Sequence, residues 1–435
     1  MERYTVRHEF FGGLVYDRNQ DANILIDDEF YELLNYLKKT NEKDISHILN
    51  LEDIDFLKQE KFLSDNKLNY RMVDSGFKEN TLSAPGRVHF YYTSKCNLNC
   101  THCFTKNSDV KREMTFSEKI SMLDQMYELG VNEILIGGGE PFIQSDFPDF
   151  VEECLKRNII TKVFTNGLLL NDKKLVERMS KWSIKYLSIS IDGADEEEYE
   201  KVRGIKGLQK IKENLKYLKE NCDFTIAASI TVNPYNYYNT IKILELIADF
   251  GFDRLKVRPV KPAGNVLKNK DIFLTAEQYA SFIKNTQKIW NRQYKEMFTL
   301  DFSWGDTRLV YNKDKNQVEP LDITYPYEGY GCFAGKVNIV FDSGGNALTC
   351  GFLPDDLSKN NEDNLQFKSL KEIWETGQKF ESLRNVKGNK VCENCKYYSV
   401  CRGGCMARNL FINRDINLPD PWCLNKYLPI KIDFT

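Results

Sequence analysis

Twelve cysteines occur in this chain of 435 residues, and ten of them fall into groups separated by short intervals. In a chain of this length such spacing is typical of metal sites, whereas disulfide scaffolds are found mainly in small secreted domains. The N-terminal segment contains no apolar stretch of a signal peptide, so we expect a cytoplasmic protein. Cys154 and Cys222 stand apart from the groups, and we expect both to be inert packing residues. We therefore expect the fold to place the grouped cysteines as ligands of several metal sites.

The overall charge and hydropathy argue against other classes of partner. Lysine and arginine number 60 against 63 acidic residues, which leaves a net charge of −3. This balance gives no reason to expect nucleic acid or an acidic membrane surface as a partner. No stretch approaches the roughly 18 uninterrupted apolar residues of a membrane span, so we expect no membrane segment either.

Residues 1–75 have the pattern of a small separate module. Two apolar runs, at residues 10–16 and 23–26, flank a polar turn and predict a hairpin. Apolar residues then recur at the spacing of one face of an amphipathic helix: Phe30, Leu33, Leu34 and Leu37. Further helical pattern follows at residues 45–49 and 54–57.

A linker at 76–86 leads into a region in which strand and helix patterns alternate. Six apolar runs predict strands: 88–92, 133–136, 161–164, 186–191, 224–231 and 255–260. The first of six helical segments begins at a capping box of Thr115 and Glu118. Such alternation predicts a parallel sheet, because each crossover requires a helix. We expect an α/β fold with an incomplete TIM-like (β/α)6 barrel over residues 87–295, although periodicity alone also allows an open doubly wound sheet.

The remaining chain falls into two further parts. Residues 296–331 are aromatic-rich and irregular in pattern, and we expect a bridging region there. Residues 332–435 begin with a hairpin signal, in which apolar runs at 337–341 and 347–352 flank a glycine-containing turn. After that hairpin the chain has few core residues and many cysteines, so we expect metal to hold it in shape.

The loop after the first predicted barrel strand carries a triplet of cysteines. Cys96, Cys100 and Cys103 have C-x3-C-x2-C spacing. Three thiolates are one fewer than a closed zinc site or a fully ligated four-iron cluster needs, so a cluster held by them keeps one iron open. A zinc site with His102 as fourth ligand is the alternative, although adjacent residues rarely direct both side chains at one ion. The loop lies at the carboxyl edge of the predicted sheet, where such folds place their chemistry.

The triplet resembles the signature of the radical S-adenosylmethionine (SAM) superfamily. The resemblance implies a four-iron cluster whose open iron binds SAM, and reductive cleavage of SAM to a 5′-deoxyadenosyl radical that abstracts hydrogen. His102 takes the position that the family fills with an aromatic residue near adenine. The other cofactor contacts that the resemblance implies follow the barrel strands: Gly138, Gly139, Glu140, Pro141, Asn166, Ser190, Asp192, Arg203 and Arg258.

These positions have different implied roles. Residues 137–141 end the second strand, where glycine lets the backbone approach a ligand and where the family binds the amino group of SAM. Ser190 is implied to meet the ribose or carboxylate, and Arg203 to pair with the carboxylate as a planar fork. The segment 165–167 also fits a plain turn. Arg258, with Gly264 and Asn265 after the sixth strand, is the weakest of the implied contacts.

The C-terminal region holds seven grouped cysteines: Cys332, Cys350, Cys392, Cys395, Cys401, Cys405 and Cys423. Their order resembles the SPASM domain, an extension that carries auxiliary four-iron clusters. The resemblance implies one cluster with four ligands: Cys392, Cys395, Cys401 and Cys423. It implies a second cluster on Cys332, Cys350 and Cys405, so the chain would hold three [4Fe-4S] clusters in all. A zinc ribbon is the alternative, but seven ligands do not divide into two closed sites.

The second auxiliary set is one ligand short. Family members that close it often have another cysteine soon after the first, whereas residues 333–338 contain none. Either another residue type is the ligand, or an iron stays open to a substrate thiolate, which would suit thioether formation. In anaerobic sulfatase-maturating enzymes an Asp base directly follows the cysteine that matches Cys350. Gly351 stands there in this chain, which counts against an oxidase of the sulfatase type.

The N-terminal module resembles the RiPP recognition element, a winged-helix-like fold that captures the leader of a ribosomally made precursor peptide. A strand edge beside an amphipathic helix suits such capture, although a dimerisation or capping module fits the pattern about as well. We therefore expect a radical SAM/SPASM peptide maturase, which crosslinks or otherwise modifies a precursor peptide and takes electrons from a reductant such as flavodoxin or ferredoxin. The alternatives are action on a folded protein, action on a small molecule such as a tetrapyrrole, and a zinc-stabilised binding protein without enzymatic activity.

Overall fold

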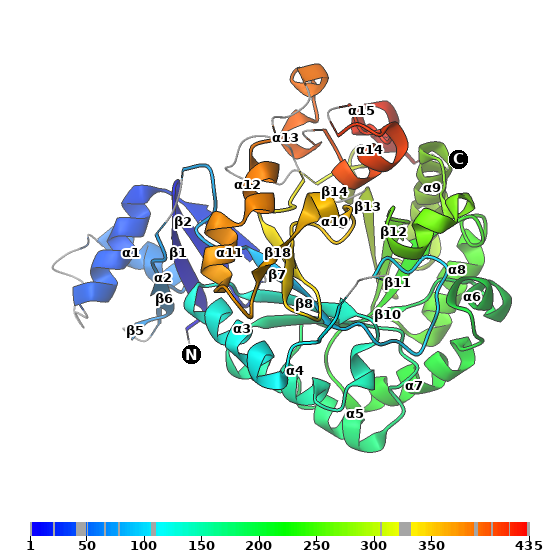
Figure 1. The fold of residues 1–435 in the computed structure, drawn as a ribbon, viewed down its shortest axis with the longest axis horizontal. Coiled ribbons are helices and arrows are strands. Elements are labelled where there is room, and N and C mark those ends of the chain that lie inside the picture. Colours follow the sequence, from blue (N-terminus) through cyan, green and yellow to red (C-terminus); the bar gives the residue numbers. More distant parts are fainter. Residues whose placement is uncertain are drawn as a thin grey trace.

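The protein consists of a small N-terminal module, a large curved sheet with helices on its outer side, and a cysteine-rich C-terminal region (Figure 1). The computed structural model describes the following residues: 2–20, 22–40, 49, 51–64, 67–76, 79–105, 110–304, 307–321, 332–386, 390–401, 403–416 and 418–432. None of the helices in these ranges is both long and apolar enough to span a membrane.

Six parallel strands form the centre of the sheet and follow one another in chain order: β7 (Arg87–Thr93), β8 (Glu133–Gly138), β9 (Ile160–Thr165), β10 (Tyr186–Ser190), β11 (Ile226–Val232) and β12 (Arg254–Pro259). All five pairings between neighbours in this series are parallel. The six predicted strands are therefore confirmed. A doubly wound sheet would reverse the strand order part-way, and this series does not, so the barrel-like interpretation is correct.

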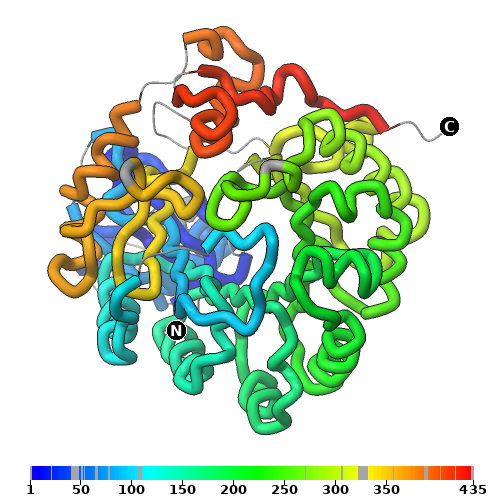
Figure 2. The backbone as a smooth tube through the Cα atoms, turned by 45° about the vertical axis from the view of Figure 1, so that its right-hand side comes forward, coloured from blue at the N-terminus to red at the C-terminus, as the bar shows by residue number. Residues whose placement is uncertain are grey.

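Helices between these strands, and one after β12, cover the outer face of the sheet: α3 (Phe116–Glu128), α4 (Phe147–Lys156), α5 (Lys173–Met179), α6 (Glu196–Arg203), α7 (Leu208–Asn221), α8 (Thr240–Phe250) and, after β12, α9 (Ala276–Gln293). Figure 2 shows them around the rim of the molecule. The predicted capping box is confirmed, because Glu118 N donates to Thr115 Oγ1 over 3.3 Å and Thr115 N donates to Glu118 Oε2 over 2.7 Å. The crossovers are thus started by local sequence signals as well as by packing.

Alternate residues of each barrel strand differ in burial, which identifies the two faces of the sheet. On β12, Leu255 and Val257 are buried among the helices, whereas Lys256 and Arg258 are half-buried on the opposite, inner face. The guanidinium carbon of Arg258 lies 5.7 Å from the centroid of the Phe164 ring. Two strands separate β12 from β9 in the sheet, so this contact crosses the inner face. The sheet is therefore curved, as a partial barrel requires.

The region 296–331 is less irregular than its sequence predicts. Its described residues, 296–304 and 307–321, contain three strands: β13 (Thr299–Trp304), β14 (Thr307–Asn312) and β15 (Gln317–Pro320). β13 extends the parallel series beside β12, and β14 and β15 continue it with antiparallel pairing. The reason lies in period-2 packing, since Phe302 and Trp304 of β13 are buried in the main core. Residues 322–331 of this expected bridge lie outside the described residues.

The C-terminal region joins the opposite edge of the same sheet. β16 (Asn338–Phe341) pairs in parallel with β7 and in an antiparallel hairpin with β17 (Asn346–Leu348), which confirms the predicted hairpin. β18 (Lys359–Asn364) completes this edge. At the other end, β19 (Ile430–Lys431) pairs with β15. The helices that follow the hairpin are short: α10 (Asp355–Ser358), α11 (Leu370–Thr376), α12 (Gln378–Arg384), α13 (Tyr398–Cys401), α14 (Met406–Asn413) and α15 (Leu424–Tyr427).

The N-terminal module has a sheet of its own, with strand order β3-β2-β1-β6: β1 (Tyr4–Glu9), β2 (Gly12–Asp17), β3 (Ala22–Ile26) and β6 (Tyr70–Val73). The predicted hairpin is β2–β3, and the predicted helix face lies on α1 (Asp28–Thr40), where Leu34 and Leu37 are buried. Helical pattern at 54–57 lies in α2 (Leu51–Gln59), and β4 (Leu63–Ser64) pairs with β5 (Lys67–Leu68). The helical pattern expected at 45–49 falls mostly outside the described residues.

A buried ion pair ties this module to the rest of the protein. Arg7 Nε donates to Glu9 Oε1 over 2.6 Å, and both side chains are almost fully buried. The other carboxylate oxygen of Glu9 accepts from Ser83 N over 2.7 Å, and Arg7 Nη1 donates to Pro85 O over 3.0 Å. The segment 76–86, expected as a linker, is therefore packed and hydrogen-bonded at its end, because Glu9 supplies the acceptors that its backbone needs.

Candidate active site

The cysteine triplet lies in the loop that follows β7, at the carboxyl edge of the parallel strands. The end of β8 holds the start of this loop, because Gly139 N donates to Thr93 O over 2.8 Å. Next to it, Glu140 N donates to Lys95 O over 2.8 Å. This close approach requires glycine at position 139, where a Cβ atom would lie 2.0 Å from the Lys95 carbonyl oxygen. Gly138 has a φ angle of +112°, which also favours glycine.

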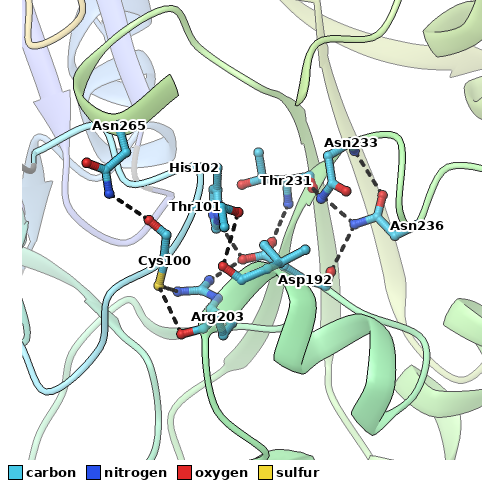
Figure 3. A network of polar contacts seen from close by, with 10 residues as sticks. Cys100, Thr101, His102, Asp192, Arg203, Thr231, Asn233, Asn236 and Asn265 are labelled. Carbon is cyan, nitrogen blue, oxygen red and sulfur yellow. Dashed lines mark hydrogen bonds and ion pairs between the residues drawn. The ribbon is translucent and has the colours of Figure 1, made fainter. Parts of the chain in front are cut away.

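Residues from other elements hold the rest of the loop (Figure 3). Asn265 Nδ2 donates to Cys100 O over 2.9 Å, and Asn265 N donates to Cys103 O over 2.9 Å. Thr101 N donates to Val202 O in α6 over 2.9 Å. The loop is thus tied to β8, to α6 and to the segment after β12, which fixes the backbone on which the three sulfur atoms stand.

Each of the three sulfur atoms has a polar neighbour: Leu98 N at 3.4 Å from Cys96 Sγ, Thr105 Oγ1 at 3.5 Å from Cys103 Sγ, and Arg203 Nη1 at 3.6 Å from Cys100 Sγ. Burial raises the pKa of the Cys96 and Cys100 thiols. No three His, Cys, Asp or Glu side chains in the described part of the chain are placed to hold a single metal ion.

Asp192, just after the end of β10, is the centre of the polar network beside this loop (Figure 3). Its side chain is fully buried, His102 Nε2 lies 3.1 Å from its Oδ2 atom, and Arg203 Nη2 forms an ion pair with the same oxygen. Thr231 N donates to its other oxygen over 2.7 Å. Burial alone would raise the pKa of Asp192, but the Arg203 charge, and then His102, hold it below its usual range. The ionised carboxylate therefore orients both side chains.

These contacts add to the roles that the resemblance implies. Arg203 is implied to pair with the carboxylate of SAM, and its guanidinium contacts Asp192 and the sulfur of Cys100. His102 is implied beside adenine, and its Nε2 atom contacts Asp192. The implied contacts with SAM stay predictions, and the network shows how the protein itself fixes the two side chains.

Glu140 and Asn166 join the ends of β8 and β9 to the cysteine loop. Thr165 Oγ1 and Asn166 N donate to the two carboxylate oxygens of Glu140, each over 2.7 Å. Asn166 Nδ2 donates to Asn97 Oδ1, inside the loop, over 2.7 Å. Burial raises the pKa of Glu140 to about 6. Both residues lie in the predicted site, and their hydrogen bonds position the neighbouring backbone.

The other predicted cofactor contacts lie around the same edge. Pro141 begins a short 3-10 turn, Pro141–Ile143, directly after Glu140. Ser190 is half-buried at the last position of β10. Arg258 lies at the carboxyl end of β12 on the inner face, over the Phe164 ring. The structure thus brings the predicted residues to one end of the barrel.

The C-terminal cysteines lie close together beyond the sheet, and their assignment to two clusters stays a prediction. Cys332, Cys350 and Cys405 belong to one small core beside the end of the sheet. In the other set, burial raises the pKa of Cys401 to about 12, and the neighbouring Cys423 adds to the increase. The two sets adjoin, because Cys332, Cys401 and Cys405 line the same pocket.

A buried carboxylate that the sequence did not single out supports this pocket. Asp420 accepts two hydrogen bonds from the Arg408 guanidinium, over 2.7 Å and 2.5 Å. It also accepts from Cys405 N over 2.7 Å and from Trp422 N over 2.9 Å. One buried side chain therefore fixes the backbone at Cys405 and next to Cys423.

Two family models match the chain over these regions. The model of the Radical SAM superfamily matches residues 90–247, and the SPASM model, an iron-sulfur cluster-binding domain, matches residues 332–396. The chain carries a radical SAM domain followed by a SPASM domain. It is an enzyme, and SAM and four-iron clusters are the cofactors that these two domains imply.

Named relatives span most of this radical SAM chain. AdoMet-dependent heme synthase of Methanosarcina barkeri is 26% identical over 358 residues, which are 80% of this chain and 98% of that protein. Mycofactocin maturase MftC of Mycolicibacterium smegmatis is 26% identical over 352 residues, 80% of this chain and 84% of that protein. The crystal structure of Streptococcus suis SuiB bound to precursor peptide SuiA has a TM-score of 0.73 at 19% identity, and the match covers 97% of this chain and 98% of that one. The last likeness establishes a shared fold.

The residues of the radical SAM loop fit its cofactors. Three soft thiol donors stand in one loop, which suits a cubane with one open iron. Beside them, two buried polar atoms have no hydrogen-bond partner among the described residues: His102 Nδ1 and Arg203 Nε. Buried polar atoms normally have partners, so these atoms are suited to meet a polar ligand.

A tyrosine on the inner face connects the radical SAM loop with the SPASM region. A Cβ atom at Gly351 would lie 1.9 Å from the hydroxyl oxygen of Tyr91, so the phenol fills that space. The Tyr91 ring lies 5.9 Å from the Phe104 ring, which lies 5.1 Å from the Phe352 ring. Burial raises the pKa of Tyr91, and the nearby Cys350 raises it further. The phenol between the two cysteine regions is therefore protonated at neutral pH.

Sequence reasoning missed Tyr91 and Asp420 for different reasons. Tyr91 alternates with the buried Phe90 and Tyr92, and this period-2 pattern assigns it to the inner face. Its contact with Gly351 joins segments far apart in the chain, which no local pattern encodes. Asp420 follows Pro419 in a cysteine-rich segment without regular structure, and nothing in its surroundings distinguishes it from a solvated acid.

Proposed function

We propose that this chain is a peptide maturase that binds a ribosomally made precursor peptide and modifies one of its residues by radical chemistry. The proposal rests on one observation: the barrel, the cysteine-rich region and the N-terminal module are packed together in one chain. The likeness to SuiB, whose structure was determined with its precursor peptide, extends over 97% of this chain and so includes the module. Mycofactocin maturase MftC among the relatives supports the same substrate class.

In this proposal the N-terminal module is the leader-binding element. Among the described strands β3 pairs with β2 alone, so it lies at an edge of the module's sheet. Its central residues Ile24 and Leu25 are 42% and 43% exposed, which leaves an apolar strand edge available to a further strand. An extended peptide adds to such an edge through main-chain hydrogen bonds, and alternate side chains supply specificity.

The proposed cofactors are SAM and three [4Fe-4S] clusters. Cys96, Cys100 and Cys103 would hold the cluster that reductively cleaves SAM to the 5′-deoxyadenosyl radical. The residues implied to bind SAM itself are His102, Gly138, Gly139, Glu140, Pro141, Asn166, Ser190, Asp192, Arg203 and Arg258. Of these, Glu140 and Asp192 also hold the loop and its neighbours in place through their hydrogen bonds and ion pairs. Flavodoxin or ferredoxin is the proposed electron donor.

The auxiliary clusters would be held by the two C-terminal sets. Four cysteines close one cluster: Cys392, Cys395, Cys401 and Cys423. Cys332, Cys350 and Cys405 leave one iron of the other without a cysteine ligand, and we propose that a substrate thiolate can bind there. Spectroscopy that identified a fourth protein ligand at this iron would remove the thiolate hypothesis and leave the rest of the proposal intact.

A small-molecule substrate is the second candidate. The AdoMet-dependent heme synthase is 26% identical to this chain along 98% of its own length, so the core of this fold also accompanies tetrapyrrole chemistry. A folded protein substrate, oxidised as in sulfatase maturation, is disfavoured. That reaction uses an aspartate at the position of Gly351, where the phenol of Tyr91 leaves no room for one.

The test is reductive incubation of the anaerobically reconstituted protein with SAM and the short peptides encoded beside its gene. The expected products are 5′-deoxyadenosine and a peptide of altered mass, both measured by mass spectrometry. The variant I24K/L25K is expected to bind the leader at least tenfold more weakly than the I241K control, which changes an exposed isoleucine on α8. Unaltered peptides, together with turnover of a tetrapyrrole, would reject the proposal.

A further inference from the structure

The inner face of the barrel carries a group of charged residues away from the cysteine loop. On β8 and β9, Lys162 Nζ donates to Glu133 Oε1 over 2.6 Å, and Arg87 of β7 lies 4.0 Å from the same oxygen. Burial would raise the pKa of Glu133, but Arg87 and Lys162 hold it below its usual value. This side of the inner face is therefore electrically compensated.

Across the inner face, β12 presents two basic side chains, Lys256 and Arg258, that have no acidic partner among the described residues. Lys256 Nζ lies 4.0 Å from the centroid of the Tyr186 ring and 2.7 Å from the Tyr186 hydroxyl oxygen. The Arg258 guanidinium lies over the Phe164 ring. Neither Lys256 nor Arg258 forms an ion pair with an acidic residue in the described ranges of the chain, and both are half-buried. An anion would supply the partner that the charged forms of these side chains lack, since a partly buried charge without a partner is unfavourable.

The protonation of Lys256 reflects this excess of positive charge. Burial lowers its pKa to about 6, and the neighbouring cations contribute to the decrease. The charged or titratable groups that face it are Arg258 and Arg254 of β12, Lys162 of β9, Tyr186 of β10 and Asp301 of β13. Asp301 is the one opposing charge among them, and Arg254 Nε lies 3.4 Å from it. The inner face near β12 thus has donors and positive charge but lacks a partner anion.

We propose that Lys256 and Arg258 form a subsite for a carboxylate group inside the barrel. This inference rests on the proposed function and deepens it, because it favours a substrate with an acidic side chain or a C-terminal carboxylate. SAM also carries a carboxylate, so the same chemistry has two sources. Arg258 supplies a planar fork for two carboxylate oxygens, Lys256 a point charge, and Tyr186 orients the amine.

The subsite couples binding to proton uptake. A carboxylate beside Lys256 favours the ammonium form, so binding raises the pKa of the amine. Affinity for a carboxylate is then constant below the pKa of the free site and falls up to tenfold per pH unit above it, until the pKa of the occupied site is reached. A neutral amide of the same shape binds without this dependence.

The test measures the titration of Lys256 directly, without turnover. The reconstituted full-length protein is labelled with 13C at the lysine ε-carbon, and the Lys256 signal is assigned with K256R. The titration midpoint is expected near pH 6, and saturating N-acetyl-L-glutamate is expected to raise it by at least one pH unit. N-acetyl-L-glutamine α-amide, in which both carboxyl groups are amides, is expected to leave the midpoint unchanged. Equal responses to both compounds, or no response to either, would overturn the subsite.

Two further arms identify the source and the partner of the carboxylate. If SAM alone shifts the Lys256 midpoint, the subsite binds the carboxylate of the cofactor. If only N-acetyl-L-glutamate shifts the midpoint, the subsite binds a carboxylate of the substrate. R258Q is expected to reduce the shift caused by N-acetyl-L-glutamate, whereas K210M, at an exposed lysine on α7, is expected to leave it intact. A normal Lys256 response in an enzyme that modifies no peptide would reject the proposed function alone.

Discussion

The hydroxyl oxygen of Tyr91 lies 1.9 Å from the place that a Cβ atom at Gly351 would take. One residue belongs to the first barrel strand and the other follows a cysteine of the SPASM region, so their contact joins the two parts at the inner face. The phenol also limits the size of the side chain at position 351, next to Cys350. A carboxylate base introduced at position 351 has no room unless the tyrosine moves.

Alanine at position 351 is therefore expected to destabilise the fold. Overpacking of this kind typically costs about 1–3 kcal/mol. G351A should lower the thermal midpoint measured by circular dichroism. The same substitution should lower the midpoint less when it is made in Y91A than when it is made in the wild type. Strictly additive effects of the two changes would mean that the contact carries no energy.

Removal of the Asp192 charge is expected to disturb two side chains at once. In D192N the buried Arg203 guanidinium loses its anionic partner, and breaking one side of a buried ion pair costs about 3–5 kcal/mol. We expect a lower thermal midpoint and a changed electron paramagnetic resonance signal of the reduced cluster, since Arg203 also contacts Cys100 Sγ. D223N changes an exposed acid and serves as the control. A resonance signal identical to that of the wild type would contradict the link between Asp192 and the loop.

Glu140 provides a prediction about pH. Its folded-state pKa of about 6 lies above the usual 4.5, so its ionised form opposes folding at neutral pH. The difference amounts to about 2 kcal/mol, present in full above pH 6 and lost as the pH falls through the range from about 6 to 4.5. The stability of the wild type relative to E140Q is expected to rise by about that amount between pH 7 and pH 4.5, measured by urea denaturation. A constant difference between the two proteins would contradict the assignment.

The buried ion pair of Arg7 with Glu9 is expected to hold the N-terminal module against the barrel. E9A leaves Arg7 buried without its carboxylate and removes the acceptors of Ser83. A cost of about 3–5 kcal/mol is expected, with faster cleavage by protease in the segment 76–86 and little change in the barrel. E29Q, at an exposed position of α1, should be cleaved like the wild type. Equal cleavage of E9A and E29Q would show that other contacts hold the module.

Iron removal is expected to affect the C-terminal region more than the barrel. Residues 390–432 have a small core and short helices, whereas the barrel has a large core of its own. Chelation under anaerobic conditions should therefore expose the C-terminal region to protease first and leave α3–α8 protected from hydrogen exchange. If the C-terminal region and the barrel lost protection together, the two regions would not unfold independently, and the prediction would be wrong.

Local sequence signals were sufficient for the barrel and insufficient for the contacts that complete the site. The parallel strands and the Thr115 capping box depend on periodicity and on residues close in the chain, and both were predicted. The strands at 299–320 were missed because their alternation is weak in an aromatic-rich segment. The ion pair of Asp192 with Arg203, the Glu9 contact with Ser83 and the Tyr91 contact with Gly351 join different elements. Such contacts follow from the geometry of the whole fold and not from spacing.

The parallel pairing of β16 with β7 has a consequence for how this protein can be altered. Because the first strand of the SPASM region is hydrogen-bonded to the first barrel strand, the two regions share one backbone scaffold. Excision of the C-terminal region would leave the β7 edge bare and prone to association with other chains. The same ladder keeps Cys350 and the radical SAM loop at a constant separation, so electron transfer between centres at these two places would not require a domain movement.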